Sequence, residues 1–257
     1  MTKKILAIHA HPDDVEILAA GTLALLARQG HQIMIVTMTP GDCGSSEYGP
    51  EEISEIRRRE AATAAALIGA QYRCAEFRDL TIFSDNAARR HVVEILRRTR
   101  PDLVLTASPV DYLCDHERTS ELVRDACFGA PAPNYRTGEE DPAGPLEAIP
   151  HLYFMDPVGG VDREGRLVVP DVVIDVASTF DRKREMLAQH ASQRNWLRKH
   201  HNVDEYMDMM ERQTRECGRR VGLEFGEGFR HYKGHPYPQT PLLEELVGPD
   251  LVVAGRG

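Results

Sequence analysis

Residues 5–14 read Ile-Leu-Ala-Ile-His-Ala-His-Pro-Asp-Asp, and an amphipathic stretch, Val15 to Arg28, follows them. The apolar beginning predicts a strand and the amphipathic stretch predicts a helix. His11, Asp13 and Asp14 then stand at the carboxyl end of a strand, where ligands bind in open α/β sheets. One imidazole and one carboxylate can share a divalent metal, and the other carboxylate stays free to act on water. The stretch therefore predicts metal-dependent hydrolytic chemistry on an α/β fold.

Strand-like and helix-like segments alternate through residue 128, which is typical of βαβ units and a mainly parallel sheet. Further strands are predicted at Gln32–Met38, Arg73–Phe77, Leu103–Thr106, Leu152–Met155 and Val172–Val176. Helices are predicted at Glu51–Leu67, Asn86–Arg98, His116–Cys127 and Thr179–Lys199, with a charged helix after Asn202. Loops or turns are predicted at Thr39–Pro50, Gly129–Pro150 and Gly226–Pro241.

The domain organisation is expected to be simple. No repeat, low-complexity tract or linker divides the 257 residues. One core of this size is most simply a single α/β domain. We therefore expect one domain over residues 1–257, with residues 202–257 as a C-terminal extension.

Composition excludes several classes of partner. The net charge of −9 and the pI near 5.7 disfavour nucleic acid and anionic membranes, which both require a basic face. No apolar stretch is long enough to span a bilayer, and the first apolar run stops at His11-Pro12, which argues against an export signal. The five cysteines form no Cys-x-x-Cys pair, which favours reduced thiols and a cytoplasmic location. The expected partner is a small molecule.

A second polar cluster, Asp111 to His116, follows the predicted strand Leu103–Thr106. Because parallel strands deliver their following loops to one edge of a sheet, His116 is expected to meet His11 and Asp14. Two histidines and one aspartate leave a fourth position for water, as in a catalytic zinc site, although Fe²⁺, Mn²⁺ or Co²⁺ suit the same ligands. The alternative is that each cluster only caps a turn or a helix. The occurrence of both clusters after buried strands favours the metal site.

These residues belong to a longer series of motifs up to about residue 195. The series comprises Ala10-His-Pro-Asp-Asp14 with Val15-Glu16, Gly21-Thr22-Leu23, Thr39-x-Gly41-Asp42, Arg57-x-x-Glu60, Leu67-Ile-Gly69, the cluster ending at His116, and His190-x-Ser192-Gln193. In this order the motifs resemble those of the LmbE-like, or PIG-L, zinc-dependent N-deacetylases. The resemblance implies a Rossmann-like, mainly parallel sheet sandwiched by helices. It also implies hydrolysis of acetamides, commonly on N-acetylglucosamine conjugates.

The resemblance further assigns roles to individual residues. His11, Asp14 and His116 would hold one zinc ion, and Asp13 would be the general base. Arg57 would reach towards the sugar. Asp79 would make another substrate contact, although a structural role as a turn carboxylate stays open.

One departure from the family pattern affects the chemistry. The family usually has His-Pro-Asp-His where this chain has Leu113-Cys-Asp-His116. The first histidine there would stabilise the oxyanion or protonate the leaving amine. His9, His231 and His235 are candidate replacements. Asp115 is expected to orient His116 through a hydrogen bond behind the metal.

The sequence leaves three functions open. The first is removal of an acetyl or small acyl group from an N-acyl amine or amino sugar. The second is cleavage of a larger amide or a thiol conjugate by a metal-dependent amidase. The third is a non-catalytic Rossmann-like binding protein. The region around Trp196 is either a helix surface or a subunit contact, so a homo-oligomer also stays open.

Overall fold

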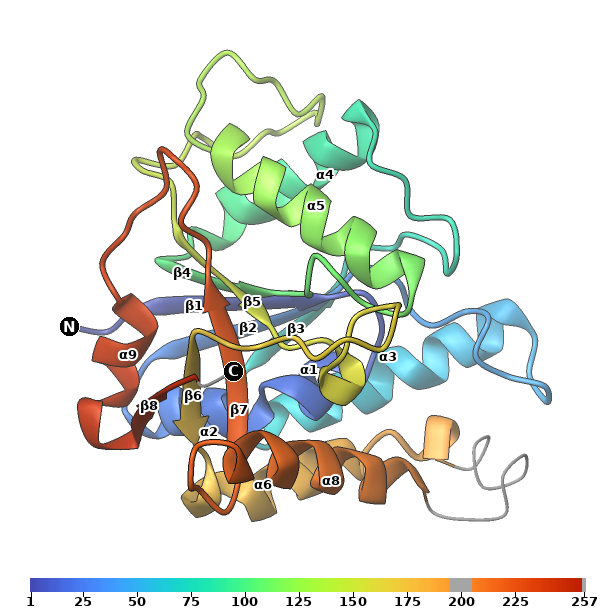
Figure 1. Cartoon of the computed structure of the whole chain (residues 1–257). Coiled ribbons are helices and arrows are strands. Elements are labelled where there is room, and N and C mark those ends of the chain that lie inside the picture. Colours follow the sequence, from blue (N-terminus) through green and yellow to red (C-terminus); the bar gives the residue numbers. More distant parts are fainter. Residues whose placement is uncertain (195–204, 256–257) are drawn as a thin grey trace.

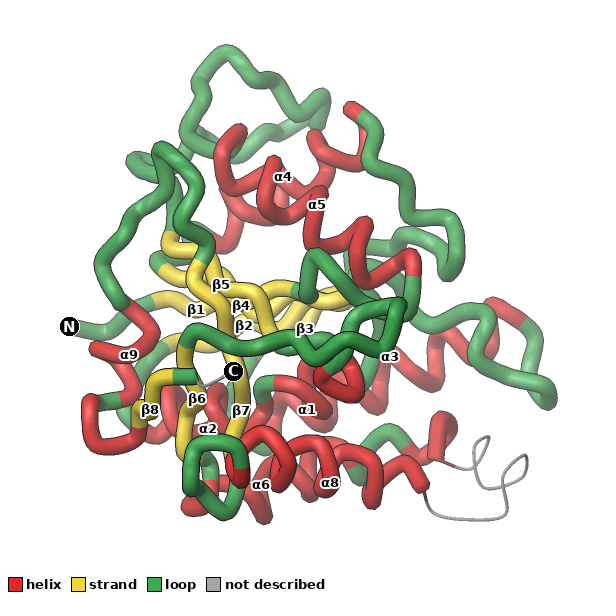
Figure 2. The backbone as a smooth tube through the Cα atoms, in the orientation of Figure 1, coloured by secondary structure: helices red, strands yellow, loops and turns green. Residues whose placement is uncertain are grey.

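Within residues 1–194 and 205–255, which the computed structural model describes, eight strands form one sheet (Figures 1 and 2). The strands are β1 (Lys4–His9), β2 (Gln32–Thr37), β3 (Gln71–Cys74), β4 (Leu103–Thr106), β5 (His151–Met155), β6 (Val172–Asp175), β7 (Gly226–His231) and β8 (Val252–Ala254). Their order is β3-β2-β1-β4-β5-β7-β6-β8. The five strands from β3 to β5 are parallel, and β7, β6 and β8 pair antiparallel. The prediction of a mainly parallel α/β sheet is confirmed.

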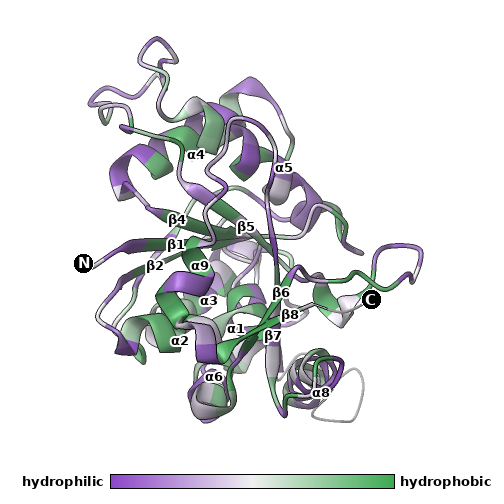
Figure 3. Cartoon of the chain, turned by 60° about the vertical axis from the view of Figure 1, so that its left-hand side comes forward, coloured by the Kyte–Doolittle hydropathy of each residue, from purple (hydrophilic) through white to green (hydrophobic). Residues whose placement is uncertain are grey.

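Helices cover both faces of this sheet (Figures 1 and 3). They are α1 (Asp14–Leu18), α2 (Ala20–Arg28), α3 (Pro50–Ala66), α4 (Asn86–Thr99), α5 (Cys114–Gly129), α6 (Phe180–Leu187), α8 (Glu205–Arg219) and α9 (Leu242–Val247). Helices α4 and α5 lie on one face, and α1, α2, α3, α6 and α8 lie on the other. None of the described helices is long and apolar enough to cross a membrane.

The strand β1 shows why two helical layers form. Ile5 and Ala7 belong to the core beneath α1 and α2, whereas Leu6 and Ile8 belong to the core beneath α4 and α5. Because successive side chains of a strand point to opposite faces, a continuous apolar run requires cover on both sides. Thus β1 is buried at the centre of the sheet, and its carboxyl end is held in a fixed position.

Two helices expected to be continuous are interrupted. The predicted helix Val15–Arg28 breaks at Ala19 (φ −143°), because the Glu227 carboxylate accepts the N–H groups of Gly21 and Thr22 and a new helix starts there. The predicted helix Thr179–Lys199 ends at Leu187, and helical residues resume at 191–194. The buried side chain of His190 occupies this break, with its Nε2 3.4 Å from Glu16 Oε1. The rest of that prediction, Trp196 included, lies outside the described residues.

The segment from Gly226, expected to be a turn, begins with the strand β7 instead. The glycines that suggested a turn are required by close packing within the sheet. A Cβ atom at Gly228 would overlap the Asp156 carboxylate, and one at Gly226 would lie 2.6 Å from the Val173 side chain. Strand β7 pairs with both β5 and β6, so the C-terminal region contributes to the same sheet. The Gly129–Pro150 segment is a loop, as expected.

Candidate active site and metal centre

The candidate site lies where the chain leaves two adjacent parallel strands. Strand β1 ends at His9 and β4 ends at Thr106, and Ile8 pairs with Thr106 in the ladder. From β1 the chain goes outward to β2 and β3 before it returns to β4, so the strand order reverses between β1 and β4. Such a reversal opens the crevice in which α/β proteins bind ligands. It places the residues up to Asp14 beside the cluster that ends at His116.

One carboxylate oxygen, Asp14 Oδ2, is the centre of this cluster. It lies 2.7 Å from His9 Nδ1, 3.3 Å from His11 Nδ1 and 3.4 Å from His116 Nε2, and it accepts the His11 backbone N–H at 2.7 Å. Burial opposes the charge of Asp14, but His116, His9 and His11 hold its pKa well below the usual range. Three imidazoles therefore converge on one ionised carboxylate.

The ligand atoms of His9, Asp14 and His116 lie within 4.8 Å of one another, so this trio can share one metal ion. His9 Nδ1 accepts the Ala10 N–H at 2.9 Å and also lies 2.7 Å from Asp14 Oδ2. His116 Nε2 and the second nitrogen of His9 are buried without a hydrogen-bond partner among the described residues. A buried group of imidazole nitrogens around one carboxylate oxygen is a donor set that fits a divalent cation.

His11 lies beside Asp14, as predicted. The three residues whose ligand atoms lie close enough to share one ion, however, include His9 and not His11. The pKa of His11 rises to about 9, because Asp115 and Asp14 outweigh the effect of burial. The pKa of His116 rises to about 10 for a similar reason, since Asp14 and Asp111 outweigh burial. The negative charge that favours protons on these rings would equally favour a metal ion. His11 as a ligand stays a prediction, and His9 is a fourth candidate.

Each of two histidines is oriented by a carboxylate on its far side. Asp115 Oδ2 lies 3.2 Å from His11 Nε2, and Asp111 Oδ1 lies 3.1 Å from His116 Nδ1. The prediction that Asp115 orients His116 is therefore wrong, because Asp115 faces the β1 loop and Asp111 takes that position. A carboxylate behind an imidazole fixes its tautomer and is common at zinc sites.

Asp13 lies beside this cluster in a strained and buried position. Its φ of 107° is in the left-handed region, and its side chain is 8% exposed. Tyr206 donates a hydrogen bond to Asp13 Oδ2 at 2.7 Å, and Arg57 Nη2 lies 3.7 Å from the same oxygen. Burial raises the pKa of Asp13 although the Arg57 charge opposes it. A buried carboxylate of raised pKa is suited to accept a proton.

The two predicted substrate-binding residues have different environments. Arg57 is buried and donates to the backbone oxygens of Pro12 and Gly41, so it joins the loops after β1 and β2. Asp79 accepts the Cys43 N–H, and its Oδ1 lies 4.0 Å from His11 Nε2. Both residues thus lie at the site, and their contact with substrate stays a prediction.

Sequence reasoning missed Tyr206 and gave no role to Asp111. No local signal identifies Tyr206, because it is 193 positions from Asp13 on a helix that the sequence marks only as charged. Of the candidate replacements for the absent histidine, His9 lies in the cluster. The ring of His231 instead stacks on Tyr153 with centroids 4.4 Å apart. Its Nε2 lies 3.1 Å from the Pro238 oxygen.

Several known proteins are similar to this chain in sequence and in fold. The profile of the PIG-L family, described as GlcNAc-PI de-N-acetylase, matches residues 6–127. The 4-oxalmesaconate hydratase of Pseudomonas putida is 29% identical over 189 residues, which span 70% of each chain. The diacetylchitobiose deacetylase of Thermococcus kodakarensis is 24% identical over 201 residues, which span 74% of this chain and 70% of that relative.

A solved structure gives the same result for the fold. The N,N′-diacetylchitobiose deacetylase from Pyrococcus horikoshii aligns with a TM-score of 0.76 at 25% identity. The alignment covers 93% of this chain and 88% of that one. The eight-stranded sheet flanked by helices is therefore the fold of a known group of enzymes.

Proposed function

Because residues 6–127 form a PIG-L (LmbE-like) family domain, we propose that the protein is a zinc-dependent hydrolase that removes an acetyl or small acyl group from an amine. The proposed substrate is an N-acetylglucosamine-like sugar conjugate. The prediction of an enzyme that hydrolyses amides is confirmed at the level of the family, since its relatives include named sugar deacetylases. The observation that carries the proposal is the convergence of His9, His11 and His116 on Asp14, with Asp13 alongside.

In this proposal, different side chains bind the metal ion and transfer the proton during amide hydrolysis. Asp14, His116 and an imidazole of the β1 loop would hold the ion, which when bound supplies a Lewis acid and lowers the pKa of water. Asp13 would accept the proton that water loses as it attacks the carbonyl carbon. The same carboxyl group would then return this proton to the amine nitrogen as the C–N bond breaks.

The groups around Asp13 prepare it for both steps. Tyr206 and Arg57 both approach Oδ2 of Asp13, so they would orient the carboxylate while its other oxygen faces water. Burial excludes bulk solvent and raises the pKa of Asp13. A base with a raised pKa becomes a better acceptor and, once protonated, remains a usable acid near neutral pH.

A second function, hydration of a carbon–carbon double bond, is favoured by Leu113. The family histidine that would protonate a leaving amine is absent at this position, and hydration has no leaving amine. Water would lose a proton to Asp13 and add to one carbon of a double bond conjugated to a carbonyl, and the other carbon would take up a proton. The hydratase of Pseudomonas putida, 29% identical, supports this alternative.

The test combines metal analysis with two assays on the purified protein. We expect about one zinc ion per chain at the histidine site and amine release from a panel of N-acetyl sugars, larger N-acyl amines and thiol-conjugate amides. Loss of ultraviolet absorbance from conjugated unsaturated carboxylic acids, without amine release, would instead favour the hydratase. A chain that binds no divalent metal at its histidine cluster would overturn both.

Asp13→Asn is the decisive variant. It should leave zinc binding intact and lower kcat/KM by a factor of about 10² to 10⁴, the usual contribution of a general base. The matched control is Asp175→Asn, at the end of β6 and three strands away from β4, which should keep full activity. An Asp13→Asn variant as active as this control would refute the role of Asp13.

A further inference from the structure

A second group of side chains of the types that ligate metals lies outside the histidine cluster. The ligand atoms of Asp42, Cys43 and Asp79 lie within 4.8 Å of one another. Asp42 and Cys43 belong to the loop after β2, and Asp79 belongs to the loop after β3. We propose that these three residues bind a second divalent cation of the thiophilic class, such as Zn²⁺.

Backbone hydrogen bonds fix this group in place. The Asp79 N–H donates to Asp42 Oδ1 at 2.9 Å, and the Cys43 N–H donates to Asp79 Oδ2 at 3.0 Å. These bonds leave Asp79 Oδ1 buried and without a hydrogen-bond partner among the described residues. The Asp79 side chain is only 8% exposed. A buried carboxylate oxygen without a donor is costly, and a cation would satisfy it.

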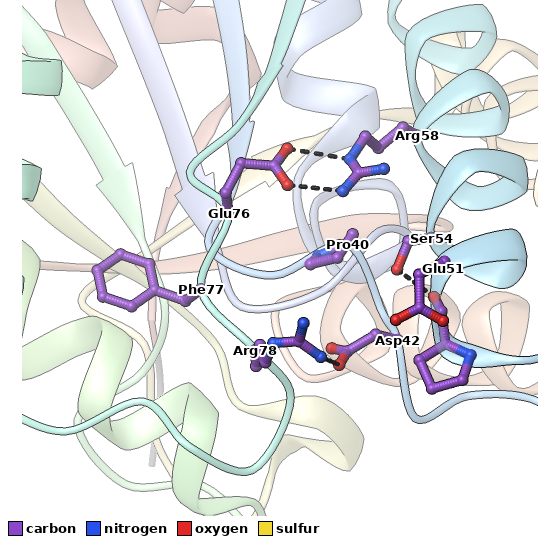
Figure 4. A pocket seen from close by; sticks show the side chains of 9 residues that line it. Pro40, Asp42, Glu51, Ser54, Arg58, Glu76, Phe77 and Arg78 are labelled. Carbon is purple, nitrogen blue, oxygen red and sulfur yellow. Dashed lines mark hydrogen bonds and ion pairs between the residues drawn. The ribbon is translucent and has the colours of Figure 1, made fainter.

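The local charge is also unbalanced. Burial raises the pKa of the Cys43 thiol, and the carboxylates of Asp79, Asp42 and Asp115 raise it further. Figure 4 shows the Asp42 carboxylate turned towards Arg78, whose guanidinium lies 3.5 Å away and is 69% exposed. Arg78 is solvated, and His11, which pairs more closely with Asp115, lies 4.0 Å from Asp79, so these two cations offset only part of the charge of Asp42 and Asp79. A bound cation would offset more, and it would also displace the thiol proton.

The donor set selects the kind of cation. A thiolate favours Zn²⁺ or Co²⁺ over Mg²⁺ and Ca²⁺, which prefer oxygen ligands alone. One sulfur and two carboxylates leave a fourth position for water or for a group of the substrate. Because Asp79 Oδ1 lies 4.0 Å from His11 Nε2, a cation there would adjoin the catalytic centre. We expect it to inhibit by occupying Asp79, a consequence that rests on the proposed function.

Cobalt distinguishes the two sites, because only the second contains sulfur. Metal-free full-length protein is titrated with Co²⁺, and the near-ultraviolet band of thiolate-to-cobalt charge transfer is recorded. The wild-type chain should develop this band and bind two cobalt ions. Cys43→Ser should lose the band and bind one ion, and Asp79→Asn should weaken the band. Cys43 is exposed, so its replacement should leave the fold intact, as circular dichroism can verify.

Cys114→Ser is the matched control. Cys114 is also exposed, and its Sγ lies 3.8 Å from Asp115 Oδ1, but it is not a member of the group. This variant should keep both the band and the second ion. Absence of the band in wild-type protein, or its survival in Cys43→Ser, would overturn the proposal. Neither result would bear on the proposed function, which Asp13→Asn tests through activity alone.

Discussion

Replacement of Lys183 by methionine should strongly destabilise the fold. Lys183 Nζ lies 2.6 Å from Glu227 Oε1, and both side chains are 1% exposed. The same carboxylate accepts the N–H groups of Gly21 at 2.9 Å and Thr22 at 2.7 Å, so it also begins α2. Lys183→Met removes the cation that pairs with this buried carboxylate. Breaking a buried pair from one side costs about 3–5 kcal/mol.

The measurement is urea-induced unfolding at pH 7, followed by circular dichroism, with thermal unfolding as a second readout. In a chain of this size, a decrease of about 3–5 kcal/mol in the free energy of unfolding corresponds to a fall in Tm of roughly 10 °C. The matched control is Lys3→Met, which removes an equally short ion pair of 2.7 Å with Asp102 at a site where both side chains are about one-third exposed. That variant should lose about 1 kcal/mol or less.

A double variant separates charge from packing. Lys183→Met combined with Glu227→Gln removes both charges and retains an oxygen that can accept one N–H group from α2. It should be more stable than Lys183→Met alone, because no unpaired charge remains buried. The reasoning is refuted if Lys183→Met loses no more stability than Lys3→Met. It is also refuted if the double variant is less stable than Lys183→Met alone.

Three further predictions concern the site and the proline-rich loop. Tyr206→Phe removes the hydrogen bond to Asp13 and should lower kcat by about tenfold or more with unchanged zinc content, as steady-state kinetics and metal analysis would measure; an unchanged kcat would exclude this positioning role. Asp111→Asn should weaken metal affinity by about 10–100-fold in a chelator competition, because the ring of His116 loses its carboxylate; wild-type affinity would contradict it. Glu94 anchors the loop 129–150 through two hydrogen bonds, and these bonds outweigh burial and lower its pKa below the ordinary 4.5. A lowered folded-state pKa contributes stability that is present above the unfolded pKa and is lost as pH falls through the folded value. The stability difference between wild type and Glu94→Gln should therefore be complete at pH 7 and shrink below about pH 4.5, and a difference that grows in acid would refute the assignment.

The sheet and the centre of the site could be predicted because their signals are local. Residues 5–8 are apolar without a break, which is the pattern of a strand buried on both faces. His116 follows another such run, and two adjacent parallel strands must deliver their loops to the same edge. The expected proximity of His11, Asp14 and His116 follows once β1 and β4 are neighbours, as they are in the sheet.

The parts that could not be predicted depend on contacts between distant segments. Strand β7 contains glycines that ordinarily mark turns, and only the close approach of Asp156 and Val173 explains them. The break at Ala19 depends on Glu227, which is more than 200 positions away. Local propensity carries no information about such partners. The sequence also placed Asp115 behind the wrong histidine, because Asp115 is the direct neighbour of His116 along the chain, whereas Asp111, five positions before it, lies beside its ring in the fold.

The absence of a histidine at position 113 limits how protons can move in this site. His9 is fully buried and faces Asp14, so as a metal ligand it would not be free to serve as an acid. Burial and the Asp13 charge raise the pKa of Tyr206 well above 10, so its phenol can donate a hydrogen bond but does not readily release its proton. Asp13, whose pKa is raised by burial, is then the carboxyl group beside the cluster that is suited both to accept and to return a proton. In amide hydrolysis the returned proton must reach a nitrogen, and in hydration it must reach a carbon. The same carboxylate can serve either reaction, so the choice between them depends on which substrate atom the pocket holds next to Asp13.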